Sequence, residues 1–161
     1  MSDDASITST NVPAVDVLIA GSGPVGCALA ALLSGSGLDV AMVAPPYRAA
    51  SGAMPRPIAL SRPSRVLLDR LGLAREVDFT AIETIHVSQS GGFGRTLIRA
   101  NEHDMPALGY VCDFARLAEA MALAPIAGRV TGTVVDWHER HDGDDATAHV
   151  RIGDVDAHVC R

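Results

Sequence analysis

Apolar runs and polar breaks alternate along the first third of the chain in the order strand, helix, strand. Residues 15–20 are apolar on both faces, which is typical of a buried parallel strand. Residues 24–35 are rich in alanine and leucine and predict a helix that a Gly-Ser-Gly sequence ends. Residues 38–43 predict the second strand. Together these segments predict a βαβ unit of about thirty residues.

The middle of the chain predicts a long loop, a helix and a hairpin. Five prolines between residues 45 and 63 indicate a long connection. Leucine spacing then predicts a helix over residues 64–71, with Gly72 as its stop. Residues 82–87 alternate apolar and polar side chains as a half-buried strand does, and residues 95–99 predict the returning strand after a glycine-rich turn.

The last third predicts one more helix and a meander of three strands. Asp113 is a candidate N-cap for a helix running to about Ala124, with Leu117, Met121 and Leu123 directed inward. Strands are expected at three segments that polar turns separate: 129–137, 147–152 and 155–160. Residues 1–13 are polar and predict a disordered lead-in.

A glycine-rich turn lies between the first predicted strand and helix. Its sequence is Gly21, Ser22, Gly23, Pro24, Val25, Gly26. The first glycine permits a sharp turn, the second leaves room for a pyrophosphate, and the third permits close packing of helix on strand. The helix N-terminus adds free N–H groups and partial positive charge. The pattern predicts a dinucleotide-binding site, against the alternative of a tight turn in an unrelated α/β unit.

Composition narrows the function classes. The chain has 161 residues, a net charge of −6 and 48% hydrophobic residues, which indicates a globular domain and argues against nucleic-acid binding. We expect no signal peptide and no transmembrane segment, because no apolar stretch approaches about 20 residues. Three scattered cysteines favour a reduced, cytoplasmic setting.

Other candidate chemistry is weaker. His138 and His141 are three residues apart near several aspartates, but we expect a solvated polar turn and no metal site there. Ser22 lacks the surroundings of a nucleophile.

Four segments carry a resemblance to a known family: residues 16–26, residues 56–61 with the helix that follows, residues 85–88 with Gly92-Phe93-Gly94, and residues 107–111 opening a helix. In this order they resemble the N-terminal part of FAD-dependent aromatic hydroxylases, most closely the ubiquinone-biosynthesis branch. The resemblance implies an α/β Rossmann-like FAD-binding domain of the glutathione-reductase and p-hydroxybenzoate-hydroxylase type. It also implies that the domain is truncated and carries the start of a substrate-domain sheet.

The resemblance implies a function and a domain division as well. Such enzymes use FAD and NAD(P)H to hydroxylate a small aromatic ring. In this branch a prenylated phenol is a candidate substrate, and peripheral membrane association is compatible with it. Residues 14–72 would be the FAD-binding unit, 73–108 a substrate-domain hairpin and 109–161 the return to the FAD-binding domain. By the resemblance the chain stops before later flavin motifs, so we expect it to be inactive alone.

Several site residues follow from the resemblance. It makes Arg56 a flavin contact, with a solvated loop arginine as the alternative, and it places Val130 against the adenine, with a core valine as the alternative. Arg116 either reaches the cofactor or faces solvent. Ala44 occupies the place where the family usually has the glutamate that binds the ribose, and Asp39 lies at the wrong end of the strand to replace it.

Two rival functions remain open. One is a non-catalytic remnant that binds a nucleotide weakly or not at all. The other is an NAD(P)-binding dehydrogenase domain, against which the predicted hairpin at residues 82–99 counts, because a plain Rossmann fold alternates helix and strand there.

Overall fold

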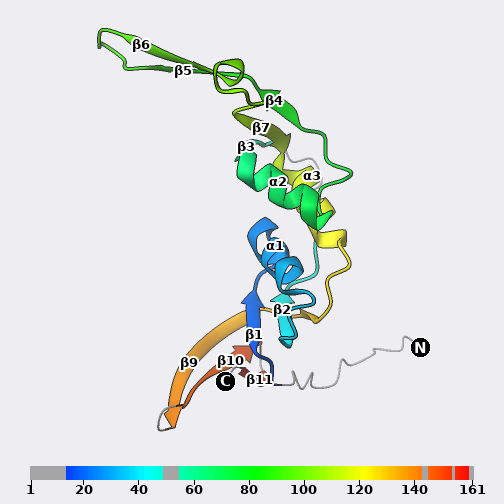
Figure 1. Cartoon of the computed structure of the whole chain (residues 1–161). Coiled ribbons are helices and arrows are strands. Elements are labelled where there is room, and N and C mark those ends of the chain that lie inside the picture. The colour runs from blue at the N-terminus through cyan, green and yellow to red at the C-terminus, as the bar shows by residue number, and fades with distance from the viewer. Residues whose placement is uncertain (1–13, 49–54, 143–144, 154, 160–161) are drawn as a thin grey trace, which may run out of the picture. The chain divides into compact units, whose positions relative to one another are not determined.

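The chain folds into two compact units, which are described separately (Figure 1). The computed structural model describes residues 14–48, 55–142, 145–153 and 155–159. The first unit combines Met1–Tyr47 with Pro125–Arg161, and the second is Arg48–Ala124. The predicted functional division at residues 72 and 108 does not coincide with these boundaries and stays a prediction.

A parallel sheet forms the centre of the first unit. Strands β1 (Val17–Ala20), β2 (Val40–Ala44) and β8 (Arg129–Thr131) pair in the order β1-β2-β8. Helix α1 (Pro24–Leu33) connects β1 to β2, and the two strands are parallel. The predicted βαβ unit is therefore confirmed. The expectation that the first strand is buried on both faces is wrong at its end, because Ala20 is exposed.

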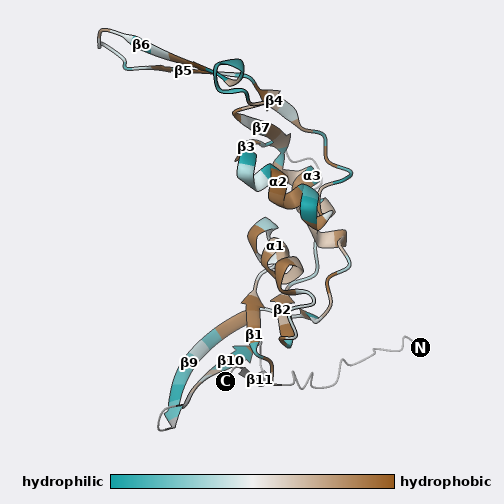
Figure 2. Cartoon of the chain, viewed as in Figure 1, coloured by the Kyte–Doolittle hydropathy of each residue, from teal (hydrophilic) through white to brown (hydrophobic). Residues whose placement is uncertain are grey.

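A three-stranded meander completes this unit. Its strands β9 (Val134–Asp142), β10 (Asp145–Ile152) and β11 (Val155–Val159) pair antiparallel in the order β11-β10-β9. Val150 and Ile152 of β10 join Val15, Ala41 and Val43 in one buried cluster. Figure 2 shows the consequence as apolar colour on β1 and β2 and hydrophilic colour along the far half of β9.

The prediction of a single strand over residues 129–137 is wrong. The chain leaves the parallel sheet after Thr131 and enters the meander at Val134. Gly132 makes the change possible, because a Cβ at this position would overlap the Ile152 side chain. The Gly132 N–H donates to the Ala44 carbonyl at 3.0 Å, which ties the change of sheet to the end of β2. The turn predicted at residues 141–145 falls partly outside the described residues, as does Asp154 of the following turn.

The second unit packs two helices on an antiparallel sheet. Strands β3 (Pro57–Ser61), β7 (Gly109–Asp113) and β4 (Thr80–Ile82) pair in the order β3-β7-β4, and helices α2 (Arg62–Leu71) and α3 (Phe114–Leu123) follow β3 and β7. Both helix predictions are confirmed. Gly72 ends α2 with a φ of 67°, and the Asp113 side chain caps α3.

Several predictions for this unit need correction. Residues 57–61 were expected in a loop and residues 109–111 at a helix start, but both are strands that pair with each other. The strand expected at residues 82–87 is divided between β4 and β5 (Thr84–Ser88). Leu123 is 75% exposed rather than directed inward, because it lies six residues after the buried Leu117 and so on another face of the helix.

A hairpin extends from the second unit. Strand β5 pairs with β6 (Arg95–Arg99), as predicted, and a short 3₁₀ helix, η1 (Ala100–His103), follows. All five residues of β5 are exposed, so the expectation of a half-buried strand is wrong. Phe93 at the tip is also fully exposed.

Candidate functional site: the turn between β1 and α1

The turn begins with a backbone conformation that favours glycine. Gly21 has a φ of +107°, a region that residues with a side chain rarely adopt. Its N–H donates to the Val43 carbonyl at 2.7 Å, so the turn is held against β2 at the point where β1 ends. The first glycine therefore does what its position in the sequence predicts.

Gly26 is required by packing. A Cβ at this position would overlap the Gly21 carbonyl oxygen and lie 3.3 Å from the Ile19 Cγ2 atom. The first turn of α1 can approach the end of β1 this closely because residue 26 has no side chain. This is the packing role expected of the third glycine in the pattern.

Gly23 is required by neither backbone nor packing. It has φ −69° and ψ 173°, an extended conformation open to any residue. A Cβ built on it would meet no protein atom within 4 Å, and the residue is exposed. The fold itself would accept alanine here. The open space above this backbone is what a pyrophosphate would need in order to approach it.

The N-terminus of α1 suits an anion. Gly23 is the N-cap, no side chain caps the helix, and no acidic residue lies in its first turn. Pro24 has no N–H, so the backbone donors near the start come from Val25 and Gly26, whose N–H groups have no carbonyl one turn earlier within the helix. The helix dipole adds partial positive charge at the same place. The arrangement can bind a phosphate through backbone groups alone.

A buried thiol donates a hydrogen bond to the backbone of the turn. The Cys27 side chain is fully buried, and its S–H donates to the Ser22 carbonyl at 3.2 Å. Burial raises the pKa of the Cys27 thiol above its ordinary value, and the nearby Arg129 guanidinium opposes that rise. The thiol is therefore neutral near pH 7. It orients Ser22, and no nucleophilic role follows for either residue.

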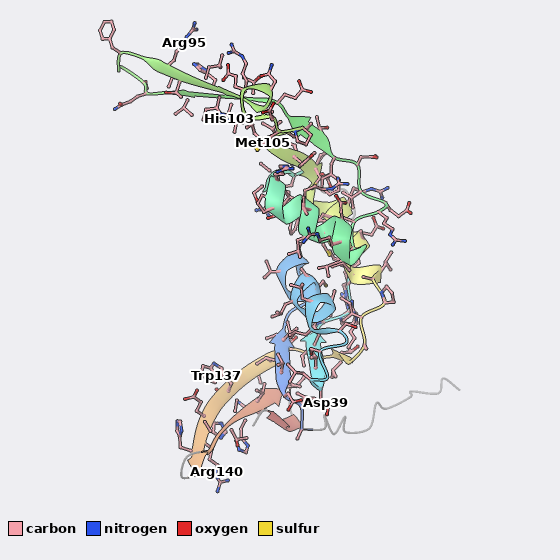
Figure 3. The ribbon with its side chains drawn as sticks, viewed as in Figure 1. Asp39, Arg95, His103, Met105, Trp137 and Arg140 are labelled. Carbon is pink, nitrogen blue, oxygen red and sulfur yellow. The ribbon has the colours of Figure 1, made fainter. Side chains whose placement is uncertain are left out.

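Ala44 lies where the sequence predicts, at the end of β2 next to the turn. It is 5% exposed and pairs with Thr131 of β8. Val130 pairs with Val43 and packs against the buried cluster, so its side chain is accounted for as a core valine. Asp39 lies directly before β2 (Figure 3), and its N–H donates to Asp16 Oδ2 at 2.8 Å. The expectation that Asp39 is at the wrong end of the strand is confirmed.

Arg56 and Arg116 lie in the second unit, where both are organised by Asp113. Asp113 Oδ2 accepts from the Arg56 backbone N–H at 3.0 Å, and Oδ1 accepts from the Arg116 backbone N–H at 3.1 Å. The Arg56 guanidinium lies 5.2 Å from the centre of the Phe114 ring. The Arg116 side chain is 70% exposed and pairs with Glu119 at 3.1 Å. Their roles toward a cofactor stay predictions.

The hydrogen bond from the Arg56 N–H to Asp113 was not predicted from the sequence. Asp113 is recognisable as an N-cap from its own neighbours, but its second bond reaches a residue 57 positions earlier. The pairing of β3 with β7 brings the two together. Such a contact could be predicted only from the pairing of the two strands, and the local pattern of residues does not show which strands pair.

Two kinds of feature are absent from the residues that the structure describes. Within them, no group of three or more His, Cys, Asp or Glu side chains is placed to hold a metal ion. No helix in the same part of the chain is long and apolar enough to cross a membrane.

Comparison with known proteins now adds to this geometry. A family model described as "FAD binding domain" matches residues 14–155. No curated protein sequence matches the chain.

Solved structures share the fold at low sequence identity. The p-nitrophenol 4-monooxygenase PnpA from Pseudomonas putida DLL-E4 is 18% identical, with a TM-score of 0.58 over 93% of this chain and 39% of that one. The substrate-free rebeccamycin biosynthetic enzyme RebC is 23% identical, with a TM-score of 0.56 over 92% and 32%. A geranylgeranyl bacteriochlorophyll reductase-like protein from Thermoplasma acidophilum is 18% identical, with a TM-score of 0.57 over 92% and 37%. The chain thus spans less than two-fifths of the length of each of these three.

Proposed function

Because the chain belongs to the family of FAD-binding domains, we propose that the turn between β1 and α1 binds the pyrophosphate of FAD. The single observation that carries this proposal is Gly23. Neither the backbone conformation at this position nor the packing around it requires a glycine, and the space above it fits a phosphate group. Val25 and Gly26 supply backbone N–H donors, and the first turn of α1 holds no carboxylate to repel the anion.

The adenosine half of FAD would lie along the carboxyl end of the parallel sheet. Ligands of open α/β sheets bind at this edge, and β2 ends there at Ala44. Val130 would lay its backbone against the adenine, while its side chain packs against the buried cluster that contains Val43. With alanine at residue 44, the ribose hydroxyls meet no carboxylate from the end of β2, so we expect weaker binding than a glutamate would give.

The activity we propose is that of the N-terminal portion of an FAD-dependent aromatic monooxygenase. FAD would supply the redox chemistry, with NAD(P)H as reductant and an aromatic ring as acceptor of the hydroxyl group. The resemblance of residues 56–61, 85–94 and 107–111 supports a ubiquinone-biosynthesis hydroxylase with a prenylated phenol as substrate. Two of the structural neighbours, a p-nitrophenol monooxygenase and a rebeccamycin biosynthetic enzyme, support the broader class.

In this proposal the protein's own groups bind and orient. The turn would fix the pyrophosphate, and Asp113 holds the backbone of the exposed Arg56, whose guanidinium lies 5.2 Å from the centre of the Phe114 ring. A held guanidinium is the kind of group that contacts a flavin or its phosphates. Arg116 is already paired with Glu119, so we assign it to the helix surface.

The test is FAD binding by the 161-residue chain, followed through quenching of flavin fluorescence. We expect saturable binding that ADP displaces, and a dissociation constant raised at least tenfold by Gly23→Ala, a loss of about 1.4 kcal/mol. Gly92→Ala, which adds the same methyl group in the other unit, is the control and should leave binding unchanged. Tighter binding of NAD⁺ than of FAD would favour a dehydrogenase domain, and no binding of either would favour a remnant.

A further inference from the structure

The meander places histidines at the same position on three neighbouring strands. His138 of β9 pairs with His149 of β10, and His149 pairs with His158 of β11. Eleven residues separate His138 from His149 in sequence, so local spacing does not reveal the row. His138 and His141, the pair that the sequence brings to attention, lie three residues apart on one strand and therefore on opposite faces.

The first two rings of this row are in contact. The His138 and His149 rings are stacked, with centroids 5.1 Å apart and planes 10° from parallel. His138 is exposed and His149 is half-buried. The next residue of β10, Val150, is buried in the apolar cluster, so the two histidines lie on the face of the meander turned away from the core.

The neighbouring positions of this face on β9 and β10 carry one carboxylate and two guanidinium groups. Asp136 and Arg151, one step along the sheet, pair with each other at 3.4 Å. On the other side Arg140 pairs with Thr147 in the strand register, and Figure 3 shows Arg140 toward the far end of β9. The carboxylate is thus already partnered by an arginine. The donors that this face offers are imidazole nitrogens, which suit zinc, copper and nickel and do not suit calcium or magnesium.

We propose that this row of histidine positions binds a divalent transition-metal ion, for which Zn²⁺ is the probe. His138 and His149 supply the ligand pair, and His158 is placed beside them by strand register alone. Zn–N bonds are about 2.0–2.1 Å, so rotation of the two stacked rings toward each other is needed for both to reach one ion. Water completes the coordination where protein ligands do not.

The experiment is a calorimetric titration of the 161-residue chain, without any affinity tag, with Zn²⁺ at pH 7.5. We expect saturable binding that falls at least about tenfold in affinity in His149→Gln and in His138→Gln, since each removes a ligand. Both positions lie on the face of the meander turned away from the core and should accept glutamine, and circular dichroism of each variant checks the fold.

Matched controls lie in the same chain. His141→Gln changes the opposite face of β9, and His86→Gln and His103→Gln change the other unit, so none of the three should alter the affinity.

Loss of binding in His158→Gln would extend the ligand set to the third strand, and retained binding would limit it to the stacked pair. No saturable binding up to about 1 mM Zn²⁺, or equal binding by wild type and His149→Gln, would overturn the proposal. Loss in Cys160→Ser with His149→Gln unaffected would also overturn it. Because the row does not involve the glycine turn, FAD binding by the same variants should be unchanged.

Discussion

Two glycines of the same turn, Gly23 and Gly26, have different surroundings, and substitution should separate their roles. Gly26 is enclosed by the Gly21 carbonyl and the Ile19 side chain, whereas Gly23 faces open space. A methyl group at residue 26 would overlap protein atoms. At residue 23 it would meet no protein atom and would affect only a bound ligand. The structure shows the packing role of Gly26, whereas the binding role of Gly23 is the proposal that the FAD titration of Gly23→Ala tests.

Gly26→Ala should therefore destabilise the fold. The added Cβ would overlap a backbone oxygen that cannot move without shifting the end of β1, so we expect a loss of about 1–3 kcal/mol in the free energy of unfolding. Urea denaturation measures it. Gly23→Ala is the matched control, expected within about 0.5 kcal/mol of wild type. Equal losses in the two variants would contradict the division of roles.

Ala44→Glu should tighten FAD binding. A carboxylate at the end of β2 would accept hydrogen bonds from the ribose, and after its own loss of hydration a net gain of about 1 kcal/mol is reasonable. That gain is roughly a fivefold lower dissociation constant, measured by flavin fluorescence. Pro46→Glu, which adds the same charge at an exposed position two residues later, should change it little. An unchanged or higher constant in Ala44→Glu would mean that residue 44 does not face the ribose.

At the scale of elements, the second unit depends on contacts between distant residues at helix ends. Asp113 caps α3 and also accepts from the Arg56 N–H before β3. Arg65 of α2 places its guanidinium 3.8 Å from the centre of the Phe79 ring while pairing with Asp69 at 2.9 Å. Asp113 and Arg65 thus each contact a residue outside their own helix, Arg56 before β3 and Phe79 before β4.

Asp113→Ala should cost about 2 kcal/mol of unfolding free energy, at the upper end for loss of a helix cap, because two backbone N–H groups lose their acceptor. Asp69→Ala removes an exposed ion pair within one helix and should cost less than about 1 kcal/mol. Chemical denaturation of both variants compares them. A smaller loss for Asp113→Ala than for Asp69→Ala would show that the two hydrogen bonds accepted by Asp113 contribute little to stability.

The elements that sequence predicted well are those with local signals. The helix α3 follows an aspartate cap, α2 ends at a left-handed glycine, and α1 follows the glycine turn, so each boundary is marked within a few residues. Strands β3 and β7 were missed because five-residue apolar segments are stabilised by their partner, 50 residues away. The divided strand at Gly132 was missed because the Ile152 side chain that requires the glycine comes 20 residues later.

At the scale of the molecule, the chain has the glycine turn in its first unit and the hairpin of β5 and β6 in its second. The face of β5 and β6 that holds Ile85, Val87 and Ile98 is apolar by register, and Ile85 and Val87 are exposed. The part that this chain matches is between 32% and 39% of the length of each of the three solved neighbours.

The 161-residue chain should bind FAD without turning it over. We expect no oxidation of NADPH above the rate with free FAD, measured by loss of absorbance of the reduced nicotinamide. Aromatic compounds should not change this rate, because the hairpin that we expect to belong to a substrate domain leaves every residue of β5 exposed. Steady NADPH consumption that depends on the protein would contradict the expectation and make the chain an enzyme by itself.

The sequence contains one tryptophan, and the meander holds it. Trp137 is 64% exposed on β9 and belongs to the same unit as the glycine turn. Indole emission is thus an optical label for one unit that needs no engineering, while Tyr110 on β7 belongs to the other. Selective excitation of the indole would follow the melting of the first unit alone. Far-ultraviolet dichroism would follow both, so any gap between the two melting curves would measure how independently the units unfold.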